Sequence, residues 1–336
     1  MPQSVKMSSA LSTPHPSTND FLVGAADWVE LTCLFRSDRN VSREDLKREL
    51  IRASKITDQN AEQKAGDAFS ELEDRIRACG LRKNAVNSYP FVLNSTKTLL
   101  AIKYPFRPTS NVACLYWFLL LISRMSMDST SRVLKSIDPT KVFERLCADV
   151  LASFWAVDGT HSGTFIFGTA ANKGSKGKAA KGNAMHAFER NIQQLCDHIG
   201  EGVGFKTGAA LPGGGDGKLD VVSWRKFNDG RPGNLIGFAQ CKTGVNWDEH
   251  LDKLQPAKFS REFMRREFIV EPVKLYMVPS RIESTRWDVH TDHAGILLDR
   301  CRIIQYGGTI RPEILKQCRD WSRAAIQRER EQIPKK

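Results

Sequence analysis

The sequence predicts a mixed α/β (α+β) protein with a helical N-terminal half and a sheet-containing C-terminal half. Residues 20–155 carry helix-start signals and long apolar stretches, while residues 184–336 open with a helix and continue as short β-type runs between turn residues. The chain has 336 residues, of which 41% are hydrophobic. That length allows about two domains, each with a real hydrophobic core.

Helix signals begin early in the chain. Ser42 and the acidic residues after it predict an N-cap and an acidic first turn, so a helix should extend to about residue 50. Residues 60–79 predict a second helix that Gly80 closes. Residues 89–102 predict a short pair of strands.

Two further helices are expected before residue 156. An apolar helix starts at residue 110 and reaches about residue 125. Asp138 and Pro139 then supply a capping side chain and a proline at the first helical position. The helix that they start should run to about Trp155.

Two segments lack the apolar periodicity of a folded element. Residues 1–19 are rich in Ser, Thr and Pro and predict a flexible tail. Residues 156–183 predict a linker or loop, because residues 168–182 hold four glycines and four lysines. The domains are therefore expected at 20–155, for sensing, partner binding or dimerisation, and at 184–336.

The C-terminal half predicts a sheet preceded by a helix at residues 184–199. Strands are expected at residues 203–207, 219–224, 235–242, 273–279 and 295–304. The second and third of these strands are joined by Asn-Asp-Gly and Pro-Gly turn signals, so they should pair as an antiparallel hairpin. The register of that hairpin is left open by the sequence.

Charge favours an acidic partner, most often nucleic acid. The chain carries 50 basic and 38 acidic residues, a net charge of +12, and its pI is about 9.4. Residues 1–155 hold 21 basic and 17 acidic side chains (+4), and residues 156–336 hold 29 and 21 (+8). The C-terminal half is therefore the better candidate for binding a polyanion.

Other sequence features exclude several classes of protein. The longest apolar run, residues 112–122, spans 11 residues, whereas a membrane span needs about 20. No signal peptide is expected, and we predict a cytoplasmic protein that binds no membrane. The eight cysteines form no C-x-x-C pair, so buried reduced thiols are expected in place of zinc sites or disulfides.

Polar residues interrupt the apolar pattern near the predicted hairpin. Gln240 and Lys242 share one face at the end of an otherwise apolar strand, where they are costly unless something uses them. Asp220 stands at the start of the preceding strand. On the helix at 184–199, Glu189 lies about 100° from Phe188, at the rim of the buried face.

These ordered residues resemble the motifs of the PD-(D/E)XK nuclease superfamily, and the Gln-x-Lys form is similar to its Mrr-type restriction endonuclease branch. The resemblance covers residues 184–280, under a third of the chain, and rests on Glu189, on Gly214-Gly215-Asp216-Gly217-Lys218-Leu219-Asp220 and on Gln240-Cys241-Lys242. It implies a restriction-endonuclease-like αβββαβ core with a mixed sheet. It also implies a metal-dependent endonuclease that cleaves DNA in bacterial defence against phage or foreign DNA.

The resemblance implies a Mg²⁺ site, with Mn²⁺ as a substitute, and gives each residue a role. Asp220, the amide oxygen of Gln240 and the backbone carbonyl of Cys241 would be ligands, and Glu189 would hold a metal-bound water or a second metal. Lys242 would orient the attacking water and stabilise charge at the phosphate. Because Gln240 replaces the carboxylate of many relatives, we expect weaker metal binding and a greater dependence on Glu189.

Five lysines are candidates for phosphate contacts, although a solvated linker explains most of them equally well: Lys173, Lys176, Lys178, Lys181 and Lys218. Asp216 is expected to form the glycine-rich turn. Expected partners are nucleic acid, with DNA favoured over RNA, and a second copy or a defence-system protein through the N-terminal domain.

The main alternative is a nuclease-like fold that binds nucleic acid or a partner protein without cutting it. The presence of both Asp220 and Lys242 favours the enzyme, since a degenerate site usually loses one of them. The simpler interpretations are an exposed hairpin with ordinary polar residues and a solvated helix flank at Glu189. Two further groups have two interpretations each. His290-Thr291-Asp292-His293 looks like a metal cluster, but a loop without a metal is the stronger expectation. A basic helix face near the substrate and a solvated surface explain three arginines equally well: Arg261, Arg265 and Arg266.

Overall fold

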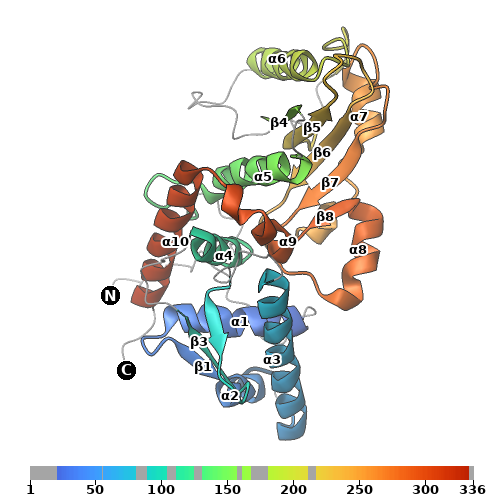
Figure 1. Ribbon diagram of the computed structural model, residues 1–336. Coiled ribbons are helices and arrows are strands. Elements are labelled where there is room, and N and C mark those ends of the chain that lie inside the picture. Colours follow the sequence, from blue (N-terminus) through green and yellow to red (C-terminus); the bar gives the residue numbers. More distant parts are fainter. Residues whose placement is uncertain are drawn as a thin grey trace, which may run out of the picture.

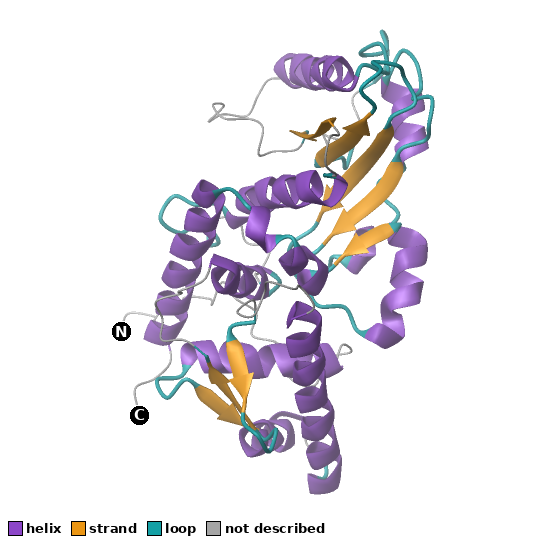
Figure 2. Ribbon diagram, viewed as in Figure 1, coloured by secondary structure: helices purple, strands orange, loops and turns teal. Residues whose placement is uncertain are grey.

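The computed structural model describes residues 21–54, 56–80, 89–103, 111–124, 131–156, 161–167, 181–210 and 217–332. The fold is mixed, with a helical N-terminal region around a small sheet and a larger sheet flanked by helices (Figure 1). Figure 2 shows the two sheets at opposite ends of the molecule, with helices between them. The predicted tail at 1–19 lies outside the described residues.

Within the described ranges, the N-terminal region consists of five helices and a three-stranded sheet. The helices are α1 (Phe21–Phe35), α2 (Arg43–Ser54), α3 (Asp58–Gly80), α4 (Asn111–Ile122) and α5 (Pro139–Trp155). The strands are β1 (Asn40–Ser42), β2 (Phe91–Leu93) and β3 (Leu99–Ile102), which pair antiparallel in the order β1-β3-β2. The predicted helices and the strand pair at 89–102 are confirmed.

Two predicted helix starts are confirmed in atomic detail. Ser42 Oγ accepts from the Asp45 backbone N–H at 3.0 Å, and the Asp45 carboxylate accepts from Ser42 N at 2.9 Å. This reciprocal pair is a capping box with Asp in the acidic position. At α5, the Asp138 carboxylate accepts from Thr140 N at 3.0 Å, and Pro139 follows the cap.

The larger sheet has five strands in the order β4-β5-β6-β7-β8. The strands are β4 (His161–Ile166), β5 (Val221–Lys226), β6 (Leu235–Cys241), β7 (Val273–Met277) and β8 (Ile296–Leu298). The first three form an antiparallel meander, and β7 and β8 continue it in parallel. The predicted hairpin is confirmed, with Val221 opposite Ala239.

Helices cover both faces of this sheet (Figure 1). On one face, α5 packs on β4 and β5. On the other face lie α6 (Lys181–Ile199) and α7 (Pro256–Phe263), whose aromatic side chains Phe188 and Phe259 share a cluster with Phe238 of β6. Next come α8 (Trp287–Ala294), α9 (Arg300–Gln305) and α10 (Pro312–Gln332), and the 3₁₀ turns are Asp248–His250, Ser284–Arg286 and Gly307–Thr309.

The structure corrects three strand predictions. Residues 203–207 form no strand, and only Phe205 makes an isolated bridge, to Met264. The strand expected at 219–224 runs over Val221–Lys226, so Asp220 precedes it. The run at 295–304 splits into β8 and α9, because the Asp299 side chain caps a helix by accepting from Arg302 N at 3.0 Å.

Two further expectations changed. Within the linker predicted at 156–183, residues His161–Ile166 form the edge strand β4, and the helix predicted from residue 184 begins at Lys181. The segment around His290 was expected as a loop but forms α8. Its short length and mixed composition gave no helical periodicity in the sequence.

The large hydrophobic core joins the two halves of the chain. It contains Leu31 of α1, Phe118 of α4 and Leu146 of α5, together with Leu275 of the sheet and Trp321 of α10. The C-terminal helix α10 packs on α4, and the Phe118 and Trp321 rings meet edge to face at 5.7 Å between centroids. The N-terminal helices and the sheet therefore share one buried interior.

Candidate functional site

The Asp220 carboxylate lies at the end of β6, beside the predicted Gln-x-Lys motif. Its Oδ2 accepts from the backbone N–H of Cys241 at 2.8 Å. The Asp220 backbone N–H in turn donates to the carbonyl of Ala239 at 3.0 Å, and only 8% of the residue is exposed. The structure thus brings Asp220 next to residues 240–242, as the motif requires.

Gln240 is completely buried, and neither its amide oxygen nor its amide nitrogen has a hydrogen-bond partner within the described residues. Side chains along β6 alternate between the two faces of the sheet: Ile236 and Phe238 belong to the cluster with α6 and α7, whereas Ala239 belongs to the large core on the other face. Gln240 therefore lies on the same face as Ile236 and Phe238 and is the polar residue at the end of that apolar row. A buried polar group without a partner costs about 1–3 kcal/mol, so a partner outside the protein chain would relieve this cost.

Lys242 immediately follows β6 and anchors its backbone to the next strand. Its N–H donates to the carbonyl of Met277 at 3.0 Å, and the residue is half-buried. Among the described residues, the Lys242 ammonium group has no hydrogen-bond or ion-pair partner, so its charge is not neutralised by a neighbouring carboxylate.

Glu189 lies on the surface of α6, the helix that packs on the same face of the sheet as Ile236 and Phe238. Its carboxylate faces the ring of His186 at 3.4 Å, and 36% of its side chain is exposed. No hydrogen bond or ion pair in the described part of the chain joins Glu189 to Gln240 or Lys242. The sequence placed Glu189 in the site because it stands at the rim of an amphipathic helix, a position that also suits a solvated flank.

Glu144 of α5 is a buried carboxylate that the sequence analysis did not single out, and it contributes together with Asp220 to the electrostatics of two neighbouring thiols. Burial raises the pKa of the Cys241 thiol well above its ordinary value. A hydrogen bond with the Cys147 thiol raises the pKa of Cys241 further, and the charges of Asp220 and Glu144 add to the rise. Burial also raises the pKa of Cys147, and the same two carboxylates contribute. Both carboxylates therefore lie within electrostatic reach of the same pair of thiols.

Helix geometry explains how Glu144 reaches this position. Glu144 is 9% exposed and stands three residues before Cys147 and seven before Leu151, both of which are buried. These positions follow one stripe of α5, the helix that packs on β4 and β5. A carboxylate within an otherwise apolar stripe was the signal in the sequence that identifies it.

The oxygen donors near the end of β6 are of the kinds that Mg²⁺ accepts. They are the carboxylate of Asp220, the amide oxygen of Gln240 and the backbone carbonyl of Cys241. Within the described ranges, no group of three or more His, Cys, Asp or Glu side chains is arranged to hold a metal. The fit therefore depends on amide and carbonyl oxygens as well as carboxylates.

The other predicted contact residues give little further support. Lys173, Lys176, Lys178 and Asp216 lie outside the described residues. Lys181 is the first residue of α6. Lys218 stands two residues before Asp220 and has a left-handed backbone, with φ of 67°.

The two alternative polar groups serve the fold. His290 is buried against Trp247, with 4.9 Å between ring centroids, and the exposed His293 faces Asp252 at 3.1 Å. Of the three arginines, Arg261 lies on α7, while Arg265 Nε donates to the carbonyl of Phe205 at 2.9 Å. They do not form one continuous helix face, because α7 ends at Phe263.

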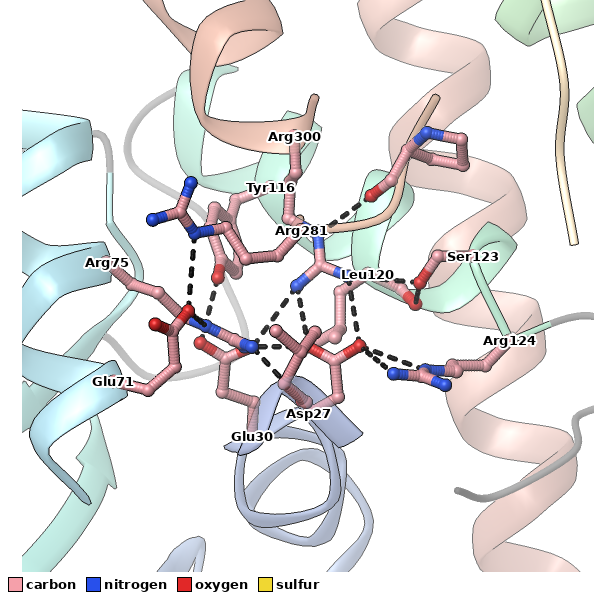
Figure 3. A network of polar contacts seen from close by, with 12 residues as sticks. Asp27, Glu30, Glu71, Arg75, Tyr116, Leu120, Ser123, Arg124, Arg281 and Arg300 are labelled. Carbon is pink, nitrogen blue, oxygen red and sulfur yellow. Dashed lines mark hydrogen bonds and ion pairs between the residues drawn. The ribbon is translucent and has the colours of Figure 1, made fainter. Parts of the chain in front are cut away.

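A second polar cluster, most of it buried, joins the N-terminal helices to the segments that follow β7 and β8 (Figure 3). Asp27 of α1 accepts from Arg75 at 2.6 Å, from Arg300 at 2.9 and 3.2 Å, and from Arg124 at 2.6 Å. Glu30 accepts from Arg75 at 2.8 Å and from the hydroxyl of Tyr116 at 2.8 Å. Among the described residues, this buried-charge cluster comprises four arginines and four carboxylates: Arg75, Arg124, Arg281, Arg300, Asp27, Glu30, Glu71 and Asp299.

Comparison of the chain with models of protein families, with curated proteins and with solved structures found no match. Within the described part of the chain, none of the helices has both the length and the apolar character that crossing a bilayer requires. Function is therefore inferred from the geometry of the site itself.

Proposed function

We propose that the larger sheet carries a Mg²⁺-dependent phosphodiesterase site and that the protein is an endonuclease acting on DNA. The observation that carries the proposal is the fully buried amide of Gln240, which has no hydrogen-bond partner among the described residues, next to the Asp220 carboxylate at the end of β6. From α5 onward the element order is α5-β4-α6-β5-β6-α7-β7, which corresponds to an αβββαβ core when α6 is taken as an insertion between the first two strands. In this assignment Glu144 takes the place that was expected for Glu189.

Each residue has a role that its surroundings support. Asp220, Glu144 and the oxygen of Gln240 would hold the cation, which when bound polarises the phosphate and acidifies a water molecule. Asp220 is oriented by the backbone N–H of Cys241. Lys242 would orient the attacking water and stabilise the negative charge that develops at the phosphate.

The choice of DNA rests on charge and on the resemblance to restriction endonucleases. The half of the chain that carries the site has the larger positive excess, +8 from 29 basic and 21 acidic residues. The same resemblance extends the proposal to defence against foreign DNA. A phage-plating assay with wild type and Asp220→Asn would test that extension separately.

The decisive experiment is incubation of plasmid, linear duplex and single-stranded DNA with the protein and Mg²⁺ or Mn²⁺. We expect metal-dependent cleavage that Asp220→Asn, Lys242→Met and Glu144→Gln each reduce about a hundredfold or more. Glu189→Gln is the matched control for Glu144→Gln, because it makes the same chemical change on an exposed helix surface. Cleavage that survives Asp220→Asn and Lys242→Met would refute the site.

The alternative, a binding module without catalysis, is favoured by the replacement of a ligand carboxylate by Gln240. It predicts DNA binding by fluorescence anisotropy that does not respond to Asp220→Asn, and no cleavage with either metal. RNA substrates in the same assay distinguish a ribonuclease from the proposed activity.

A further inference from the structure

Two buried thiols meet where the N-terminal helices pack on the C-terminal half of the chain. Cys79 lies near the end of α3 and Cys301 lies in α9, and the Cys79 thiol donates to the Cys301 sulfur at 3.8 Å. The two residues are 2% and 3% exposed and lie 222 positions apart in the sequence. Their helices pack against each other (Figure 1). All eight cysteines of the chain are reduced, so this contact joins two thiols.

The buried-charge cluster holds both cysteines in place. Cys79 lies one turn after Arg75 on the buried side of α3, and Cys301 directly follows Arg300. These two arginines donate to the same oxygen of Asp27, at 2.6 and 2.9 Å (Figure 3). The ion pairs therefore keep α3 and α9 together, and the two sulfurs meet beside them.

Two other pairs of cysteines cross the same junction. Cys147 of α5 hydrogen-bonds to Cys241 of β6, and Cys114 of α4 lies within electrostatic reach of Cys318 of α10. In every pair one thiol belongs to an N-terminal helix and the other to the C-terminal half. Most of the cysteines are therefore placed where a crosslink would join the two halves of the chain.

We propose that Cys79 and Cys301 form a disulfide under oxidising conditions and that this bond locks the N-terminal helices onto the C-terminal half. A disulfide requires a distance of about 2.05 Å between its sulfurs, so rotation about the Cα–Cβ bonds must bring the two sulfurs closer than their present contact. The bond would close a loop of 222 positions. Closing so long a loop removes much of the freedom of the unfolded chain, so the oxidised protein should be the more stable form.

The oxidant in this proposal is a peroxide, and two thiols plus hydrogen peroxide give one disulfide and two waters. One thiolate attacks the O–O bond and becomes a sulfenic acid, and the hydroxide that leaves takes up the proton that the thiol lost. The second thiol then attacks the sulfenic sulfur, so the S–S bond forms as the S–O bond breaks and the second water leaves. The two sulfurs lose two electrons, which the peroxide gains.

The surroundings of the pair make the lock slow to respond. The hydrogen bond with Cys79 raises the pKa of Cys301 well above its ordinary value, and burial raises it further. The reactive thiolate is therefore rare while α9 is packed on α3. Oxidation should proceed when α9 opens locally, and a helix of six residues opens more readily than the core around it. The lock thus answers sustained oxidation rather than a brief pulse.

Peptide mapping tests the bond. Wild type is treated with hydrogen peroxide, quenched in acid, alkylated and digested without a reductant. We expect a peptide pair that links Cys79 to Cys301 and that disappears after treatment with dithiothreitol. Digests in which only Cys147 and Cys241 are linked, or in which Cys79 and Cys301 carry only oxygen adducts, would overturn the proposal.

Thermal unfolding tests the lock. Peroxide-treated wild type should unfold about 5 °C or more above the reduced protein, and dithiothreitol should reverse the shift. Cys79→Ala and Cys301→Ala should each abolish the shift, with circular dichroism showing that the reduced variants are folded. Cys33→Ala is the matched control and should keep it, because Cys33 is equally buried but its thiol donates to the carbonyl of Leu100 at 3.4 Å.

A shift that survives Cys301→Ala, or a linked peptide pair without any shift, would refute the lock. Neither measurement uses DNA cleavage, so the outcome is independent of the proposed nuclease.

Discussion

Arg300 is the residue whose replacement should show most clearly how the two halves of the protein are joined. Its side chain is completely buried and donates to both oxygens of Asp27, at 2.9 and 3.2 Å. It also donates to the hydroxyl of Ser123 at 3.0 Å and to the carbonyl of Pro279 at 2.9 Å. Arg300→Met keeps a side chain of similar length and removes all of these bonds.

The size of the effect follows from the burial of the Arg300–Asp27 ion pair, in which both side chains are completely buried. Removing Arg300 takes away one of the three arginines, with Arg75 and Arg124, whose charges hold the buried Asp27 carboxylate ionised. Removing one partner of a buried ion pair costs about 3–5 kcal/mol. Arg48→Met is the control, because its ion pair with Asp45 is at the surface with 67% of Arg48 exposed, and it should cost about 0–1 kcal/mol.

The assay is urea unfolding followed by circular dichroism, for Arg300→Met, Asp27→Asn and the double variant. The double variant should lose less than the sum of the single variants, by about 1–3 kcal/mol, because it removes the buried carboxylate from which Arg300→Met takes one compensating charge. Burial alone raises the pKa of Asp27, but Arg300, Arg124 and Arg75 hold it well below its usual range. Such a group stabilises the fold above its unfolded pKa and loses this contribution as pH falls. The cost of Arg300→Met should therefore shrink in acid, and a cost under about 1 kcal/mol at pH 7, or additive single variants, would refute the reasoning.

Three further predictions concern the larger sheet and its loops. Gln240→Leu should stabilise the protein by about 1–3 kcal/mol in thermal or urea unfolding, because it removes a buried amide that has no partner among the described residues. The same variant should abolish metal-dependent cleavage. A destabilised variant would mean that the amide is satisfied within the fold. Burial raises the pKa of Glu201, but hydrogen bonds from Asn234, Gly233 and Ile269 outweigh this effect and lower the pKa. Glu201→Gln should therefore reduce the free energy of unfolding by about 1–3 kcal/mol at pH 7, and by progressively less as the pH falls below about 4.5. A cost that does not depend on pH would contradict this. Gly237→Ala should reduce the free energy of unfolding in urea by about 1–3 kcal/mol, since its Cβ would lie 2.4 Å from Leu275 Cδ1 and 3.2 Å from the Trp155 ring. Gly80→Ala is the control and should be neutral or slightly stabilising, because no atom lies within 4 Å of its added Cβ.

The sequence predicted elements best where one local signal decided the structure. Asp138 and Pro139 start a helix whatever surrounds them, and the turn residues between β5 and β6 required a hairpin. The prediction of one strand at residues 295–304 was wrong because an apolar run suits a strand as well as a short helix. The Asp299 cap alone separates the strand β8 from the helix α9. Strand β4 was missed because its Gly163 and flanking glycines resemble a linker. That glycine is required by packing, since a Cβ at residue 163 would lie 2.5 Å from the Trp224 ring.

The candidate site divided in the same way. Asp220 and residues 240–242 are close in sequence through one hairpin, so local pattern was enough to bring them together. Which helix supplies a further carboxylate depends on which helix packs against that hairpin, and helix packing is a property of the tertiary structure. Glu189 on α6 and Glu144 on α5 both precede the hairpin, and their helices pack on opposite faces of the sheet, which the sequence pattern alone does not reveal.

The sharing of one core by distant parts of the chain also sets the order in which it can fold during synthesis. Arg330 of α10 donates to the carbonyl of Leu34 in α1 at 2.7 Å, across 296 positions of sequence. Helices α1 and α4 therefore cannot bury their apolar faces until residues 312–332 have left the ribosome. The nascent N-terminal region should depend on chaperones for most of translation, and a chain truncated before α10 should aggregate even though the larger sheet is complete.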